Sequence, residues 1–123
     1  MRKFLMLTAL LVVAASPAFA CSCAPDADGS QAARVMADPA NSIVDVTVRG
    51  FNASNGQSML QIDNVRSGGL VARDIRAKFT SSASCGVVPN QKKMTLIVHN
   101  DSDGRYSIGN LCDTQAVLKK LGQ

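Results

Sequence analysis

Tryptophan and glutamate are absent from the chain, and histidine and tyrosine occur once each in its 123 residues. Every acidic side chain is therefore an aspartate, and most aspartates fall in turn-forming stretches, such as Asp26, Asp28, Asp101 and Asp103. No nucleophile, base and orienting residue stand together in a pattern typical of a catalytic site. We therefore expect a protein that is not an enzyme and that needs no cofactor.

Two other shortages narrow the choice of partners. Beyond residue 20 the only aromatic residues are Phe51, Phe79 and Tyr106, too few for a platform on which single-stranded nucleic acid could stack. The chain has 13 basic and 9 acidic residues, a formal net charge of +4, and setting aside Arg2 and Lys3 leaves about +2. No later segment approaches the roughly 20 apolar residues that a membrane-spanning helix requires. We expect neither a nucleic-acid partner nor a membrane span.

The start of the chain has the pattern of a secretory signal peptide. Two basic residues open it, and an apolar run follows as far as Ala15. Ala18 and Ala20 then place small residues at the alternate positions that signal peptidase recognises. We expect residues 1–20 to be removed and residues 21–123 to form one exported domain, periplasmic or secreted.

Four cysteines follow this segment, at Cys21, Cys23, Cys85 and Cys112. An even count in a small exported domain predicts two disulfides, for which three connectivities exist. Cys21 and Cys23 are too close in an extended segment to pair without strain. Each is therefore expected to bond one of the two distant cysteines, in either of two arrangements.

Two other interpretations of the first cysteines differ in their chemistry. A lipid anchor on Cys21 would need a large aliphatic residue three places earlier and a small one two places earlier, where the chain has Ala18 and Phe19. Lipidation would also leave an odd cysteine. In the second interpretation, Cys21 and Cys23 bind a soft metal such as Cu(I), although the other candidate ligands have no ligand spacing: His99, Met36, Met59 and Met94.

The hydrophobic periodicity predicts a mainly β domain. A short helix is expected at residues 30–38 with Ser30 as its N-cap, and a second at residues 114–121 with Asp113 as its cap. Five antiparallel strands are expected between them, at residues 42–51, 57–65, 70–79, 93–99 and 105–112. Their predicted inward residues include Val44, Val46, Val48, Leu60, Ile62, Val71, Ile75, Ala77, Phe79, Tyr106 and Ile108, with Val117, Leu118 and Leu121 on the last helix. Five short strands close most economically into a Greek-key OB-fold barrel.

Three short stretches together resemble a known family. "CSCAP" begins at Cys21, "SCG" contains Cys85 in a central loop, and Cys112 follows the fifth strand. This arrangement is similar to the netrin-like OB-fold domain of the tissue inhibitors of metalloproteinases, over nearly all of residues 21–123. The resemblance implies the pairs Cys21–Cys85 and Cys23–Cys112.

The resemblance also implies a mechanism. In the family, the amine and carbonyl of the first residue chelate the zinc of a metalloproteinase, and the side chain of the second enters the specificity pocket. Here these are the backbone N and O of Cys21 and the side chain of Ser22. An α-amine with a pKa of about 7.7 to 8.0 can donate to zinc near neutral pH.

The chain departs from the family in three respects. It lacks a cysteine near residues 30–40, it lacks the second, cysteine-rich domain, and its loop between the first two strands is short. The partner is therefore expected to be a zinc metalloproteinase or another exported protein. The alternatives are a binding or structural module without inhibitory activity and a cysteine-based metal-binding protein. The oligomeric state is left open.

Overall fold

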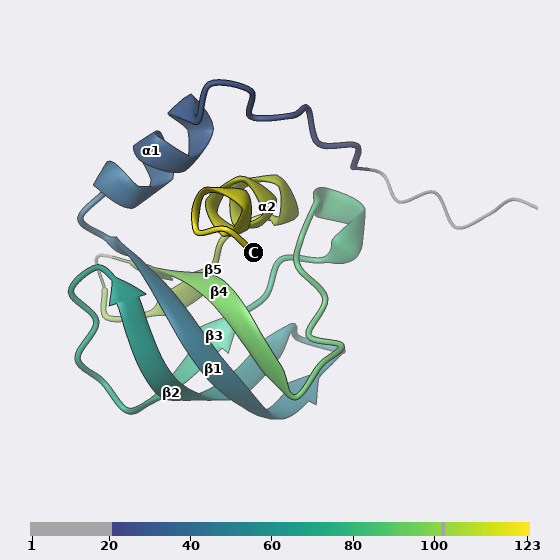
Figure 1. The fold of residues 1–123 in the computed structure, drawn as a ribbon. Helices are drawn as coiled ribbons and strands as arrows, with labels where there is room; N and C mark the ends of the chain where they lie inside the picture. Colours follow the sequence, from purple (N-terminus) through teal and green to yellow (C-terminus); the bar gives the residue numbers. More distant parts are fainter. Residues whose placement is uncertain (1–20, 102) are drawn as a thin grey trace, which may run out of the picture.

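The computed structural model describes residues 21–101 and 103–123, so the predicted signal peptide, residues 1–20, lies outside the described residues. Along the chain, the elements are α1 (Ser30–Ala37), β1 (Asn41–Asn52), β2 (Gln57–Ser67), β3 (Asp74–Lys78), the single 3-10 turn η1 (Ser82–Ser84), β4 (Lys93–Asn100), β5 (Tyr106–Ile108) and α2 (Leu111–Lys120). Figure 1 shows the strands below and the two helices together above them, with the chain start passing along the same upper side.

The strands close into a barrel in the order β1-β2-β3-β5-β4, which confirms the predicted five-stranded OB-fold class. The prediction that all strands are antiparallel is wrong for one pair, because β3 and β5 run parallel at Ala77 opposite Tyr106 and Lys78 opposite Ser107. A closed ring with an odd number of strands cannot alternate direction throughout. At least one parallel pair is therefore required. The β3–β5 pair is the shortest pairing in the barrel, with two residue pairs, and the β4–β5 pair is the next shortest, with three.

The barrel interior is filled by alternate residues of the strands, and the sequence pattern selected several of them, including Val44, Leu60 and Ile75. Val44, Leu60 and Leu96 are almost completely buried, and the cluster around them continues with Val46, Ile75, Ala77, Phe79, Val87, Val98 and Ile108. Val48, Ile62 and Tyr106 pack at its margin. Burial of this apolar surface supplies most of the stability of such a domain, at about 25 cal/mol per Å².

A second apolar cluster lies outside the barrel, under the helices. Ile43 on β1 and Ile97 on β4 point away from the barrel interior and pack against both helices. The helices contribute Ala32, Val35, Ala116 and Val117. Because β4 is covered on both faces, Leu96, Ile97 and Val98 are all buried, which explains its nearly continuous apolar run.

The third strand is shorter than predicted. It begins at Asp74 rather than at residue 70, and Val71, which the alternation places inside, is 94% exposed. Gly68 has a φ of +99°, and a Cβ there would lie 2.6 Å from the Asn41 carbonyl oxygen. The chain therefore turns tightly after β2 and runs as a loop to residue 73.

The predicted helix caps are also wrong at the level of single residues. The Ser30 side chain does not cap α1; the Asp26 carboxylate accepts hydrogen bonds from the Gln31 and Ala32 amides, each at 3.0 Å. Helix α2 begins earlier than expected, at Leu111, because the Asn110 side chain accepts from the Asp113 amide. The fifth strand ends correspondingly early, at Ile108.

The last helix presents a narrower apolar face than predicted. Val117 is buried and Leu121 packs at the edge of the outer cluster. Leu118 is only half-buried and belongs to neither apolar cluster of the described chain.

Two disulfides fasten the chain start to the body of the fold. Cys21 bonds Cys85 with 5.5 Å between their Cα atoms, and Cys23 bonds Cys112 with 5.2 Å. These are the pairs that the resemblance implied, so of the two open arrangements this one is confirmed.

A polar network joins three strands on the outer face of the barrel. Asp45 on β1 accepts hydrogen bonds from the Thr95 hydroxyl on β4 at 2.6 Å and from the Arg66 guanidinium on β2 at 2.9 Å. Asn64 on β2 donates at 3.4 Å. These bonds, first of all the one from Thr95, lower the pKa of the Asp45 carboxyl, although desolvation opposes them.

The substitution Asp45→Asn should lower the free energy of unfolding at neutral pH by about 1 kcal/mol. A lowered pKa in the folded state means that this stabilisation is complete above the unfolded value of about 3.9 and is lost as pH falls through the folded value. The free energy of unfolding, measured by chemical denaturation at several pH values, should therefore fall more steeply between about pH 5 and pH 2 for the wild type than for the variant. Asp74→Asn, at an exposed carboxylate, is the control and should keep the wild-type slope; parallel curves for Asp45→Asn would contradict the expectation.

Removing either disulfide by paired alanine substitution should lower the free energy of unfolding by roughly 2 to 5 kcal/mol. When one disulfide is already formed, the second closes a covalent ring that consists of residues 21–23, residues 85–112 and the two disulfides. This ring is the same whichever disulfide forms second. The two losses should therefore agree within about 1 kcal/mol in chemical denaturation. A large loss for one pair and none for the other would show that the ring argument is wrong.

Candidate functional site

Residues 21–25 form an arm that the two disulfides alone fasten to the described part of the fold. No hydrogen bond joins this arm to any other described residue. The first such contact along the chain is made by Asp26, which caps α1. The position of the arm therefore depends on what holds Cys85 and Cys112.

Cys85 is held by a tight turn that its neighbour makes possible. The turn η1 ends at Cys85, whose φ of 65° is the one positive value at a non-glycine residue in the described chain. The Gly86 amide bonds the Ser81 carbonyl at 2.9 Å. A Cβ on Gly86 would lie 1.7 Å from the Thr80 carbonyl oxygen, so only glycine fits. This explains the order of residues in "SCG".

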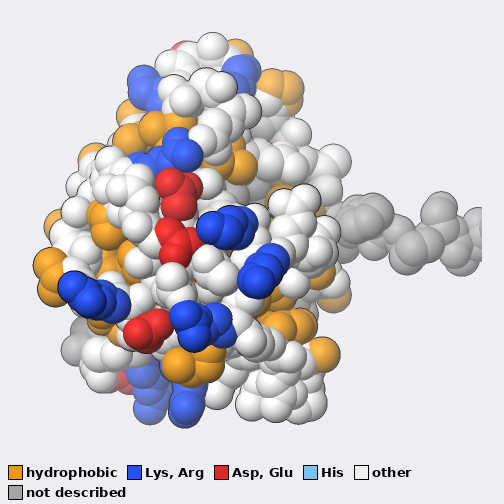
Figure 2. All heavy atoms as spheres, turned by 60° about the horizontal axis from the view of Figure 1, so that its bottom comes forward, with side chains coloured by type: hydrophobic (Ala, Val, Ile, Leu, Met, Phe, Trp, Pro, Cys, Tyr) orange, Lys and Arg blue, Asp and Glu red, His pale blue; other side chains and the backbone are white. Residues whose placement is uncertain are grey.

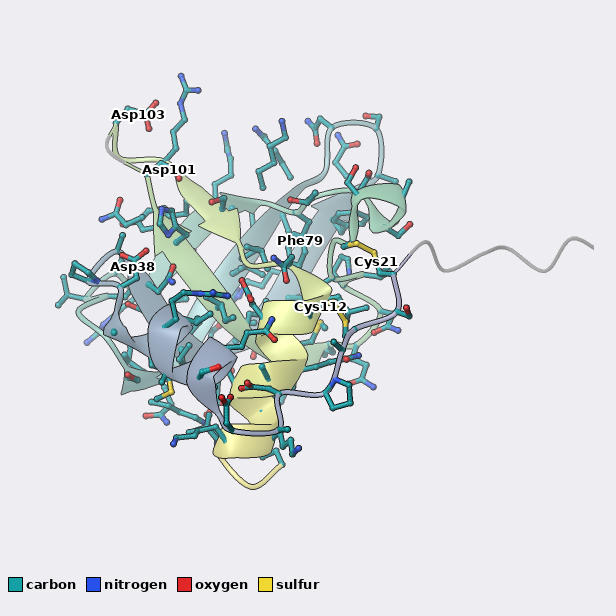
Figure 3. All side chains as sticks on the ribbon, turned by 90° about the horizontal axis from the view of Figure 1, so that it is seen from above. Cys21, Asp38, Phe79, Asp101, Asp103 and Cys112 are labelled. Carbon is teal, nitrogen blue, oxygen red and sulfur yellow. A yellow bond between two sulfur atoms is a disulfide. The ribbon has the colours of Figure 1, made fainter. Side chains whose placement is uncertain are left out.

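The Cys85 turn and the start of α2 form one hydrogen-bonded unit. The Leu111 amide donates to the Cys85 carbonyl at 2.8 Å, and Gly86 pairs with Asn110. Cys112 is the next residue of the same helical turn. Seen from above, Cys21 lies at the rim of the barrel and Cys112 at the start of α2 (Figure 3). Both disulfides therefore end on the same small unit.

Ser22 is the exposed residue between two half-buried cysteines. A cavity of about 250 Å³ lies beside Cys21, lined mainly by apolar residues, among them Val87, Val88, Met94 and Leu111. The sequence-predicted site residues Cys21 and Ser22 thus lie on the arm, next to this apolar hollow. Because the arm is fixed by a disulfide on each side of Ser22, it can present its backbone and the Ser22 side chain in one orientation.

The residues of the alternative metal site are not brought together. All four cysteines are in disulfides, so the thiolates that a soft metal requires are consumed. The His99 Nδ1 atom lies 2.7 Å from the Asn41 Oδ1 atom at the far end of β4. Met36 packs under the helices, Met94 packs at the barrel core and Met59 is exposed on β2. Within residues 21–101 and 103–123, no three His, Cys or Asp side chains are grouped as metal ligands.

Sequence reasoning missed the residues that position the arm. Asp26, Asn110 and Gly86 carry no chemistry of their own, but they fix α1, α2 and the Cys85 turn. The available signals were the aspartate before the first helix, the asparagine before the second and the glycine directly after Cys85.

No helix in the described part of the chain is long and apolar enough to cross a membrane. No protein-family model, curated protein or solved structure matches the chain.

Proposed function

We propose that this chain is an exported binding module that inhibits a zinc metalloproteinase through its N-terminal arm. The observation that supports the proposal is the exposed Ser22 between Cys21 and Cys23, each bonded to one hydrogen-bonded unit. A terminus is normally the loosest part of a domain. Here two covalent bonds within three residues oppose that looseness.

The inhibitory chemistry uses the first residue left by signal peptidase. Cleavage before Cys21 frees its α-amine, and the amine and the Cys21 carbonyl oxygen together bind the catalytic zinc. A catalytic zinc keeps one coordination position for water, and that water becomes the nucleophile. Displacing it stops hydrolysis, while the Ser22 side chain enters the pocket that selects substrate side chains.

Rigidity contributes to affinity in this scheme. Binding a flexible terminus would require ordering its backbone, at about 1 to 2 kcal/mol per residue. The disulfides on both sides of Ser22 order the arm before binding, so less of the interaction free energy is lost. The apolar hollow beside Cys21 adds surface that a protease loop can cover.

The intact mass of the exported protein should correspond to a chain that begins at Cys21, unmodified and four hydrogens lighter than its reduced form. Mass spectrometry before and after reduction with alkylation measures this. A lipid adduct, an additional N-terminal residue or a free thiol would remove the chelating amine or the fixed arm, and the inhibitory mechanism with it.

One alanine inserted before Cys21 should abolish inhibition, because the chelating nitrogen becomes a peptide amide. Ser22→Arg should change which protease is inhibited, because it changes the side chain offered to the pocket. The assay measures hydrolysis of a quenched fluorogenic peptide by a panel of zinc metalloproteinases. Val71→Arg, at a residue that is 94% exposed on the loop before β3 and outside the arm, is the control and should inhibit as the wild type does. Inhibition by the alanine-extended protein would refute zinc chelation; if no form inhibits any protease, the chain is a binding module without this activity.

A further inference from the structure

A groove of about 580 Å³ opens at the lower end of the barrel, away from the helices. We call it the mouth groove. Its walls are the turn between β1 and β2, the end of β3 and the loop at residues 87–89. Its volume is within the range of about 300 to 1,000 Å³ that is typical of ligand sites. No residue of the arm lines it, but Ser82, Val87 and Val88 line both this groove and the hollow beside Cys21.

One wall of the mouth groove is a strand end with a neighbour on one side only. Strand β1 pairs with β4 as far as Thr47 opposite Lys93, and the Val48 amide then bonds the Lys92 carbonyl. Beyond a register shift at Arg49, the residues Gly50, Phe51 and Asn52 pair with β2 alone among the described strands. The Gly50 and Asn52 carbonyls already accept hydrogen bonds, from the Ser58 hydroxyl and the Gly56 amide. The backbone edge left for another strand is therefore that of Arg49 and of Phe51, which lines the groove.

The floor and the opposite lip of the groove are apolar. Phe51 lies edge-on to the buried Phe79, with ring centroids 5.9 Å apart, and is 44% exposed. Val88, on the loop after Cys85, also lines the groove and is 47% exposed. Exposed apolar side chains on both walls of a groove are typical of a surface that a partner covers.

The charges at the groove decide between the possible occupants. Lys78 lines it, and Lys92 lies where β4 leaves β1. None of the described residues that line it is acidic. Figure 2 brings the lower side of the barrel forward and shows basic side chains spread over it, with the acidic ones gathered mainly near its middle. A second copy of this chain would bring like charges together, whereas a segment carrying carboxylates would neutralise them.

We propose that the mouth groove binds an extended segment of another protein, in which apolar residues alternate with acidic ones, as an added strand along residues 49–52. The backbone edge of β1 supplies hydrogen bonds, and the alternating side chains enter the apolar floor or face the lysines. This binding goes beyond the inhibition proposed above, since it uses no atom of Cys21 or Ser22.

The probe is a short fluorescein-labelled peptide in which valine or phenylalanine alternates with glutamate, titrated with the exported protein and followed by fluorescence anisotropy. Val88→Asp and Lys78→Glu should each weaken binding by about fivefold, the upper end of what an exposed charge contact contributes, because each places a carboxylate against an acidic peptide. Val71→Asp and Lys120→Glu are matched controls on exposed residues far from the groove and should bind as the wild type does. The alanine extension before Cys21 should also bind normally, which separates this proposal from inhibition.

A second set of peptides tests the added strand itself. Two peptides are compared, one methylated at its odd-numbered amides and the other at its even-numbered amides. One of them should not bind and the other should bind as before, because only alternate amides of an added strand face β1. A peptide with lysine in place of each glutamate should not bind. Equal binding of the two methylated forms, binding of the lysine peptide, unchanged binding by Lys78→Glu, or no binding of the first peptide would each overturn the proposal. A dimer in sedimentation velocity that Val88→Asp dissociates would assign the groove to a second copy instead.

Discussion

The geometry of the chain start depends on one short backbone contact, the hydrogen bond from the Leu111 amide to the Cys85 carbonyl oxygen. It joins a loop and a helix that are far apart in sequence, and each carries one of the cysteines that hold the arm. Disulfides that ended on separate mobile segments would fix the arm to nothing rigid. Because both disulfides end on this unit, which is part of the barrel and α2, the positions of Cys21, Ser22 and Cys23 are restricted as well.

The barrel and the outer cluster depend on each other through two strands. β1 and β4 place Val44 and Leu96 inside the barrel while Ile43 and Ile97 hold the helices outside it. A chain of this size buries too little surface for either cluster to be sufficient alone. The helices protect the outer face of β1 and β4, and α2 in turn carries Cys112 to the arm.

Much of the barrel could be predicted because alternation along a strand is a local property. Val44, Val46, Leu60, Ile75 and Ile108 were assigned to the interior from the pattern alone and are buried there. The failures have non-local causes. The contact of Gly68 with the Asn41 carbonyl, which ends β2 and exposes Val71, joins segments far apart in sequence. The parallel β3–β5 pair follows from closure of the barrel, and closure cannot be deduced from the sequence of any single strand.

The candidate site divides in the same way. That the first two cysteines reach distant partners could be deduced from their spacing, but which partner each takes came only from the resemblance. The caps at Asp26 and Asn110 were missed because Ser30 and Asp113 are equally acceptable capping residues in sequence, and tertiary packing chose between them. The mouth groove has no sequence signal, since it forms only where the β1–β2 turn meets the loop that follows Cys85.

The parallel pairing of β3 with β5 makes this contact the seam of the barrel. It joins only Ala77 with Tyr106 and Lys78 with Ser107, so this ladder is shorter than any other pairing between the described strands. Each of the two strands has a longer pairing on its other side, β3 with β2 and β5 with β4, so the seam can open while those pairings remain. Amide exchange at the seam therefore reports opening of the closed barrel separately from unfolding of the whole sheet.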